Sequence, residues 1–204
     1  MNRNHSRIQG FTLIELVVTL VVLAILLAIA LPSFTTAINN NHVASASNTL
    51  LADISYARTE AIDRGTDVSI CPSSTGQTCT GGTAYDTGWL VYTYTAGNAV
   101  VSTAYDNTSA TNVVLRYTTA QRGVSIQTES TVPIISFGPQ GEMKPDTTES
   151  SFVTCSTSGT GGTAQSTATV PGVWLTILGS GSAYNQPWPV GTACTGPAPA
   201  SSTG

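Results

Sequence analysis

One acidic side chain near the start of the sequence stands where an acid is costly. The stretch from Phe11 to Leu31 has only three polar side chains, which are Thr12, Glu15 and Thr19. A carboxylate inside an apolar segment costs about 2.5 to 3.5 kcal/mol on membrane-insertion scales, so it is retained for a function and pairs with an opposite charge. We therefore expect Glu15 to have a function and a positively charged partner.

The four cysteines are the second group of residues with evident chemistry. If the chain beyond Leu31 is exported, an even number of cysteines indicates two disulfides. Three pairings are possible, and we favour Cys71 with Cys79, a short local loop, and Cys155 with Cys194, which ties down the C-terminal segment. A zinc site is the alternative. It is disfavoured because the sequence has no C-x-x-C and only two histidines, His5 and His42.

No arrangement of residues indicates catalysis or a cofactor. A Ser or Cys nucleophile needs a positioned base, and His42 is the only histidine outside the first ten residues. Asp86 with Asp106, or Glu142 with Asp146, could contribute to a calcium site, but no run supplies the spaced oxygen ligands of a calcium loop. We therefore interpret them as solvated turn acids and expect no catalytic residue, no metal and no cofactor.

A long N-terminal helix must position Glu15. The 21 residues from Phe11 to Leu31 form roughly 32 Å of helix at about 1.5 Å each, enough to cross a membrane. Arg3 and Arg7 precede this segment and no basic residue follows until Arg58, which indicates export of everything after Leu31. A secretory signal cleaved after Ala28-Ile29-Ala30 and a plain membrane anchor are two alternatives, and neither accounts for the carboxylate.

The helix is predicted to continue beyond the apolar segment as an amphipathic half. Pro32 removes one backbone hydrogen bond, so a kink or a locally melted turn is expected there. Gly65 after Arg64 indicates the helix end. One apolar stripe follows the helical period at Ile38, Val43, Ala46, Leu50, Leu51, Ile54, Ala57, Ala61 and Ile62. Polar residues are assigned largely to the other side, namely Asn39, Asn40, Asn41, Ser45, Ser47, Asn48, Asp53 and Arg58.

From Asp67 the periodicity changes to short β-branched runs separated by turn residues, and we predict about seven strands. They are Asp67 to Cys71, Trp89 to Tyr94, Val113 to Thr118, Val124 to Thr128, Ile134 to Phe137, Phe152 to Cys155 and Val173 to Leu178. A helix followed by strands predicts an α+β fold in which the helix covers one antiparallel sheet. The expected inner face consists of Trp89, Val91, Val114, Ile126, Ile135, Phe137, Val153, Trp174 and Ile177.

The C-terminal part, from Gly179 to Gly204, has no clear period. We expect an irregular arm held by Cys194, with disorder after it. Trp188 is either an exposed contact residue or packed against the sheet.

The charge balance argues against nucleic acid as a partner. The chain has 7 basic and 11 acidic residues, and loss of Arg3 and Arg7 with a cleaved leader would leave 5 against 11, a net charge of −6. Phosphate binding depends on clustered Lys and Arg. No Lys or Arg follows Lys144.

The hexamer GFTLIE, from Gly10 to Glu15, resembles the start of type IV pilins. The resemblance implies that residues 1–10 are a leader cut after Gly10 by a prepilin peptidase, and that the new N-terminal Phe11 is N-methylated. It also implies that Glu15 meets the free amine of a neighbouring subunit in a filament. The expected organisation is leader 1–10, membrane and filament-core helix 11–31, amphipathic helix 32–65 and exported β-rich domain 66–204.

Later segments resemble the GspH/FimT family of minor pilins and pseudopilins. They are Ala57 to Ile62, Val68 to Ser73, Gly88 to Val91 and Ile135 to Gly141. DNA-binding members carry a Gly-Arg-x-Arg motif after the last strand, whereas this chain has Gly181-Ser182-Ala183-Tyr184 there.

The resemblance implies the type IV pilin fold and a non-enzymatic role as a minor pilin that joins or primes the pilus tip. The implied partners are other major and minor pilins, the prepilin peptidase and the inner membrane, with the domain in the periplasm before assembly and in an extracellular pilus afterwards. A type II secretion pseudopilin is one alternative, and a DNA-uptake pilin is another, disfavoured because the basic motif is missing.

Overall fold

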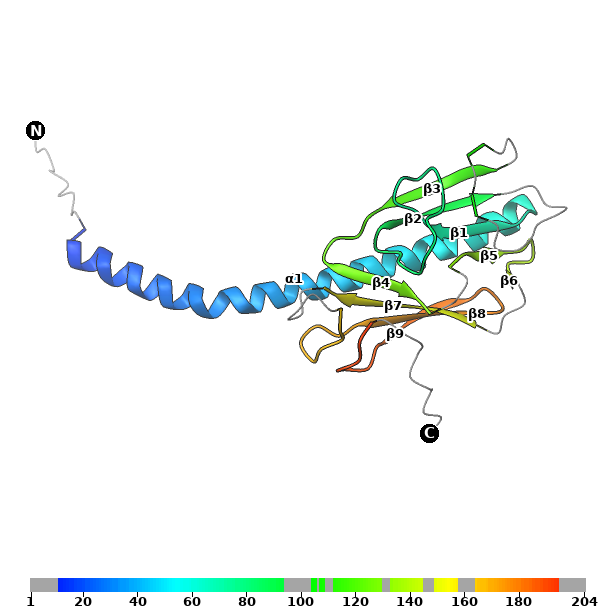
Figure 1. Cartoon of the computed structure of the whole chain (residues 1–204). Coiled ribbons are helices and arrows are strands. Elements are labelled where there is room, and N and C mark those ends of the chain that lie inside the picture. Colours follow the sequence, from blue (N-terminus) through cyan, green and yellow to red (C-terminus); the bar gives the residue numbers. More distant parts are fainter. Residues whose placement is uncertain are drawn as a thin grey trace, which may run out of the picture. The chain divides into compact units, whose positions relative to one another are not determined.

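The computed structural model describes residues 11–93, 104–105, 107–108, 112–129, 133–144, 149–157 and 164–194. The described chain contains one helix and nine strands (Figure 1). It divides into two units, Met1–Ile38 and Asn39–Gly204. The N-terminal unit is helical from Leu13 onward, and the second unit contains the rest of the helix with the nine strands.

Helix α1, Leu13–Arg64, is 52 residues long. It continues without a break through Pro32, so the described helix has no melted turn there, and a kink stays a prediction. The predicted end is confirmed: the helix stops at Arg64, and Gly65 follows with φ of 63°. The left-handed backbone that closes a helix in this way favours glycine, which has no Cβ to clash.

The strands form two antiparallel sheets, which corrects the expectation of a single sheet. The first has the order β3-β2-β1-β5-β6 and consists of β1 Val68–Pro72, β2 Gly88–Thr93, β3 Val113–Thr119, β5 Ile135–Phe137 and β6 Met143–Lys144. The second has the order β4-β7-β8-β9 and consists of β4 Val124–Thr128, β7 Glu149–Ser156, β8 Val173–Leu178 and β9 Ala183–Pro187. Although β4 follows β3 closely, it pairs with β7 rather than with β3. Such a choice of partner depends on contacts between distant residues, which the pattern of a single strand does not encode.

The main hydrophobic core lies between the second half of α1 and the two sheets. The helix contributes Val43, Ala46, Leu50, Ile54, Ala57 and Ala61, all nearly or fully buried, as the apolar stripe predicted. The sheets contribute Val68, Ile70, Trp89, Val91, Ile135 and Phe137 from the first, and Val124, Ile126, Phe152, Leu175 and Ile177 from the second. Each fully buried large side chain contributes about 1.5 to 3 kcal/mol. The core therefore joins both sheets to one helix face.

Tyr85 connects the two sheets across this core. Its hydroxyl donates to the carbonyl of Ile70 in β1 at 3.2 Å, and its backbone N–H donates to the carbonyl of Ile126 in β4 at 2.8 Å. Its ring meets that of Phe152 edge-on at 4.8 Å. Complete burial raises the pKa of Tyr85 well above its ordinary value, so the phenol stays protonated and able to donate.

Three of the residues expected on the inner face lie elsewhere. Phe152 of β7 enters the core, so its neighbour Val153 faces the opposite side of the sheet, where Trp174 packs in the same cluster. In β3 the register shifts beside Val91, and Val114 pairs with Tyr92 of an outer cluster. Leu115 packs on the core instead.

The polar side of α1 also needs correction. Ser47 is 1% exposed and Asp53 is 3% exposed, so both face the interior rather than solvent. Conversely, two members of the predicted apolar stripe, Ile38 and Ile62, are about half exposed.

The expected irregular arm is ordered up to Cys194. It contains β9, which pairs with β8 over its whole length, and a bridge between Gln165 and Ala193. Trp188 is 2% exposed and packs edge-on against Trp174 at 5.9 Å, so it is a packed residue rather than a surface contact. The disorder expected after Cys194 concerns residues 195–204, which lie outside the described residues. Asp106 and Asp146, which were considered for a calcium site, also lie outside them.

Candidate functional site

The N-terminus of α1 places Glu15 in the first helical turn. Thr12 precedes the helix, and its hydroxyl oxygen accepts from the backbone N–H of Glu15 at 3.3 Å. Its carbonyl accepts from Leu16 N–H at 3.2 Å. Thr-x-x-Glu is the pattern of a capping box, in which the two residues satisfy unpaired N–H groups at a helix start. The positive end of the helix dipole also favours a carboxylate in this turn.

Glu15 has no ion-pair partner within the described residues. Its side chain is exposed, and the next basic residue along the sequence is Arg58. Phe11, at the predicted cleavage point, is 82% exposed, and Gly10 lies outside the described residues. The acid and the aromatic residue are thus both exposed among the described residues.

The whole apolar part of α1 is presented in the same way. Its large hydrophobic side chains from Leu13 to Leu31 are between 43% and 82% exposed. In the described chain, α1 is the one helix long and apolar enough to cross a membrane, judged by length and composition. A continuous apolar surface of this kind needs a lipid environment or apolar partners.

Asp53 lies at a buried junction between α1 and the first sheet. Its carboxylate accepts from Trp89 Nε1 at 2.8 Å, from Thr118 Oγ1 at 2.6 Å and from Arg116 Nη1 at 2.7 Å. The Arg116 guanidinium also stacks over the ring of Tyr56 at 3.9 Å. A buried carboxylate is tolerated when its oxygens are paired and hydrogen-bonded, and these three donors meet that requirement.

Sequence reasoning missed the burial of Asp53, although a signal was present. Asp53 follows Leu50 by three residues and precedes Ala57 by four, and both neighbours are fully buried. At helical spacing this position belongs to the same face as the apolar stripe. The position of Asp53 in the helical period therefore predicts burial, and its placement on the side opposite the stripe is wrong.

Arg58 connects the helix to turns in both sheets. Its Nε donates to the carbonyl of Gly141, in the turn between β5 and β6, at 2.9 Å. Its Nη2 donates to the carbonyl of Ser180, in the turn between β8 and β9, at 3.1 Å. Gly181 has φ of 79°, and a Cβ there would lie 1.9 Å from the Gly141 carbonyl oxygen. The close approach of the two turns therefore requires glycine.

Residues 46–181, about two thirds of the chain, match the family model described as type II transport protein GspH. The chain belongs to the GspH family. Residues 5–31 of this GspH-family chain also match the prokaryotic N-terminal methylation motif, which covers Gly10, Phe11 and Glu15. The family model therefore matches most of the β-rich domain, and the methylation motif matches the segment with the predicted processing and assembly residues.

Solved structures similar to the GspH-family chain are pilins and pseudopilins. Two crystal structures of the Pseudomonas aeruginosa type IV minor pilin FimU share 21% and 22% identity, with TM-scores of 0.47 and 0.49. They cover 74% and 76% of this chain and 97% and 95% of FimU. The minor pseudopilin EpsH of the Vibrio cholerae type 2 secretion system shares 14% identity with a TM-score of 0.43, covering 72% of this chain and 97% of EpsH. No curated protein matches the chain.

Two disulfides are present in the domain of the GspH-family chain. Cys71 in β1 joins Cys79, and Cys155 in β7 joins Cys194. These are the pairings favoured on sequence grounds. All four cysteines are used in this way, and the described residues contain no group of three or more potential metal ligands.

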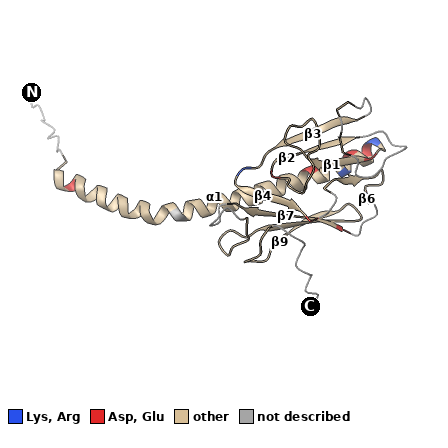
Figure 2. Cartoon of the chain, viewed as in Figure 1, with Lys and Arg blue, Asp and Glu red and all other residues tan. Residues whose placement is uncertain are grey.

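In Figure 2 the charged residues of the GspH-family chain lie mostly near the end of α1 and in the adjoining strands. A hydrogen bond from Arg64 lowers the pKa of Glu60, and a hydrogen bond to Asp67 raises the pKa of Lys144. The pair of Arg64 and Glu60 is a surface ion pair within one helix, and such pairs typically contribute less than about 1 kcal/mol. The segment Gly181-Ser182-Ala183-Tyr184 forms the turn before β9 and the start of that strand, and it has no basic side chain.

Proposed function

We propose that this chain is a minor type IV pilin, a non-enzymatic subunit that joins or primes the pilus tip. The observation that carries the proposal is Glu15: a carboxylate in the first turn of an outward-facing apolar helix, with no ion-pair partner among the described residues. The family membership and the methylation motif support it.

In the proposed mechanism, a prepilin peptidase cuts between Gly10 and Phe11, and Phe11 becomes the methylated N-terminus. The apolar part of α1 holds the subunit in the inner membrane with the domain in the periplasm. On extraction into an extracellular filament, apolar side chains of neighbouring pilins replace the lipid. Glu15 then pairs with the Phe11 amine of a neighbour, and each charge offsets the cost of burying the other.

The proposal is tested with Glu15→Gln, which keeps the size of the side chain but removes its charge. Loss of one partner leaves the other charge buried and unpaired, at a cost of about 3 to 5 kcal/mol, so the amount of chain in sheared pili should fall at least about a hundredfold. Thr19→Val is the matched control. Thr19 is a polar residue of the same apolar segment, and its hydroxyl donates only to the Leu16 carbonyl one turn earlier.

The amount of Thr19→Val chain in pili should equal that of the unchanged chain. Mass spectrometry of the incorporated chain should also show methylated Phe11 as the first residue. Unchanged incorporation of the Glu15→Gln chain would remove the proposed role of the carboxylate, and a different N-terminus would remove the processing scheme.

A second candidate is a minor pseudopilin of a type II secretion system, which the description of the matching family favours. Such a subunit would use the same helix, the same cleavage and the same Glu15. Deletion of the chain separates the two functions. Loss of surface pili with normal protein secretion supports the pilin, and loss of secretion with normal pili supports the pseudopilin.

A further inference from the structure

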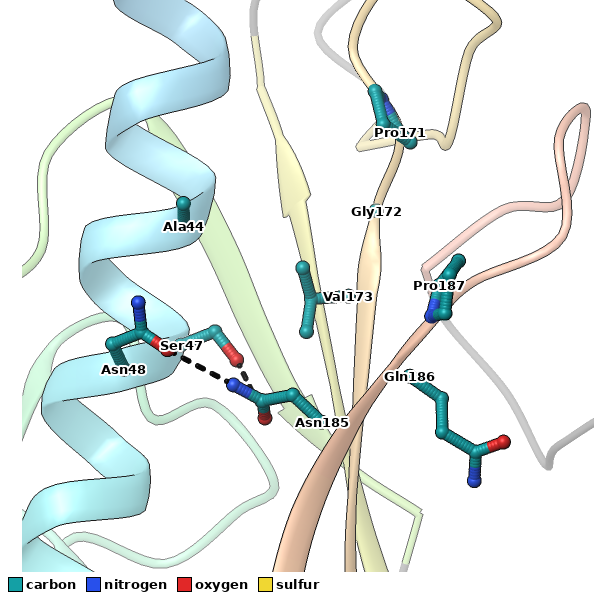
Figure 3. A pocket seen from close by; sticks show the side chains of 9 residues that line it. All are labelled: Ala44, Ser47, Asn48, Pro171, Gly172, Val173, Asn185, Gln186 and Pro187. Atoms are coloured by element: carbon teal, nitrogen blue, oxygen red, sulfur yellow. Dashed lines mark hydrogen bonds between the residues drawn. The ribbon is translucent and has the colours of Figure 1, made fainter.

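A pocket of about 290 Å³ lies between α1 and the edge of the second sheet (Figure 3). The helix side presents Ala44 and Asn48, and the sheet side presents Val173, Asn185 and Pro187. All of its lining residues are uncharged, and aliphatic and proline side chains form much of the wall. Neither Glu15 nor the Asp53 junction contributes to it.

Side-chain amides connect the helix to its surroundings on both sides of Ala44. Four residues before Ala44, Asn40 Nδ2 donates to the carbonyl of Thr169 at 3.0 Å. Four residues after it, Asn48 Oδ1 accepts from Asn185 Nδ2 at 3.1 Å. These three helix positions share one face. The pocket therefore has fixed walls, and the small side chain of Ala44 leaves it open.

The backbone beside the pocket can pair with another strand. β9 is the last strand of its sheet, and among the described residues no strand pairs with its outer edge. The backbone bonds from Leu178 N–H to the Ser182 carbonyl and from Trp188 N–H to the Gly172 carbonyl fix the alternation of the β8–β9 ladder. By that alternation, Ala183 and Asn185 direct their backbone N–H and C=O groups away from β8.

The charge of the pocket limits what can occupy it. In residues 39–52, the part of α1 within the second unit before Asp53, the only ionisable side chain is that of His42. Figure 2 shows this part of the helix in tan, without Asp, Glu, Lys or Arg. A charged occupant would lose hydration without gaining a partner. An unpaired strand edge beside an apolar pocket is the arrangement used for strand addition, in which the backbone of an extended peptide pairs and its alternate side chains enter pockets.

We propose that an extended, uncharged segment of a neighbouring filament subunit adds alongside β9 and inserts an apolar side chain over Ala44. This proposal rests on the proposed function as a filament subunit, and it assigns a second contact, distinct from the one at Glu15. Asn48 and Asn185 form the polar rim, and Val173 and Pro187 form the apolar wall.

The test fills the pocket. Ala44→Phe places an aromatic ring in the space, and because Ala44 is exposed on the helix, the core is untouched. Ala52→Phe is the matched control, since Ala52 is also exposed, lies two turns further along α1 and does not line the pocket. In sheared filaments Ala44→Phe should fall about tenfold, the change that corresponds to about 1.4 kcal/mol, while Ala52→Phe should match the unchanged chain. Thermal unfolding of each full-length variant in detergent should match that of the unchanged chain.

The two proposals fail in different ways. If the unchanged chain is absent from purified filaments, the proposed function itself fails. If the unchanged chain and Ala44→Phe are present at equal levels, only the pocket assignment fails.

A second measurement identifies the occupant. The photo-reactive residue p-benzoylphenylalanine is placed at Gln186, or at Ala52 as the control, in cells that make filaments. Gln186 borders the pocket, and its side chain points away from the space over Ala44, so the probe leaves that space open (Figure 3). A cross-link from position 186 alone, to a peptide of a subunit with its own N-terminal methylation motif, supports strand addition. A lipid or saccharide adduct, equal cross-linking from both positions, or no cross-link from position 186 overturns it.

Discussion

Asp53 and Glu15 are both acids in largely apolar surroundings on one helix, yet they differ in where their partners lie. The donors to Asp53 are Trp89, Thr118 and Arg116, which are 36, 65 and 63 residues away in the same chain. Glu15 has no such donor among the described side chains. We infer that Asp53 orients the helix on its own domain, whereas Glu15 is available to another subunit.

Replacement of Asp53 tests the first of these roles. Asp53→Asn removes the charge and presents an NH₂ group to donors that need an acceptor, so it should lower the free energy of unfolding by about 2 to 3 kcal/mol. Denaturant unfolding of the full-length chain in detergent measures the change. Asp63→Asn, at an exposed position on the same helix, should change it by no more than about 0.5 kcal/mol. Equal midpoints for the two variants would show that the buried carboxylate does not stabilise the helix contact.

Burial could be estimated from spacing more reliably than from residue type. The stripe from Val43 to Ala61 is buried as predicted, because helical periodicity records which positions share a face. The sequence could not reveal what neutralises the acid within that stripe. Its partners come from β2 and β3, and their approach depends on how the sheet packs against the helix.

At the scale of elements, α1 contacts both sheets through the hydrophobic core and, near its C-terminal end, through the side chain of Arg58. Arg58 donates to carbonyls in a turn of each sheet, and Gly181 permits the backbone approach to Gly141. These contacts therefore hold both sheets to α1 near the C-terminal end of the helix. This joint is a backbone contact, so its geometry tolerates little change.

Gly181→Ala tests the joint. The variant must adopt a positive φ and also place a Cβ against the Gly141 carbonyl oxygen, so it should lower the free energy of unfolding by about 3 to 4 kcal/mol. Gly191→Ala is matched, because Gly191 has φ of 83° but open space around a Cβ, and it should cost only about 1 to 2 kcal/mol. The difference between the unfolding midpoints of the two variants measures the effect of the contact between the Gly181 and Gly141 turns. Equal losses of unfolding free energy would show that this contact adds no constraint.

The strands of this domain were predictable to different degrees. β4 and β8 coincide with the predicted ranges, because each has a run of apolar or β-branched residues bounded by turns. β6 has two residues and β9 consists of Ala-Tyr-Asn-Gln-Pro, which lacks that pattern. Both are strands because a neighbour is available for pairing, which is a property of the fold.

At the scale of the whole molecule, the two disulfides enclose loops of very different length. Cys71 and Cys79 are separated by 8 positions, and Cys155 and Cys194 by 39. The second link ties the segment after β9 to β7 and contributes to the cluster of Trp188 and Val153. In the chain-entropy model the longer loop stabilises more, because the link removes more freedom from the unfolded chain.

Removal of each disulfide tests this difference. The double variant Cys155→Ala with Cys194→Ala should lose about 4 kcal/mol of unfolding free energy, and Cys71→Ala with Cys79→Ala about 2.5 kcal/mol. Unfolding under identical non-reducing conditions gives the comparison, with the unchanged chain plus reductant as the reference. A larger loss from the shorter loop would contradict the entropic account for this protein.

The sequence by itself determined the long helix and its end at Arg64, the apolar segment with its acid and the positions of most strands, and it favoured the cysteine pairing that the structure has. These features depend on composition, on periodicity along one segment, or on a local contrast such as one carboxylate among apolar residues. The processing at Gly10 and Phe11, the role of Glu15 and a kink at Pro32 stay predictions.

Only the tertiary structure decided the division of the strands into two sheets, the burial of Asp53, the order of the segment around β9 and the pocket over Ala44. Each depends on which distant segments meet. That choice is made by the summed free energy of contacts spread over the whole domain, and no window of neighbouring residues contains it.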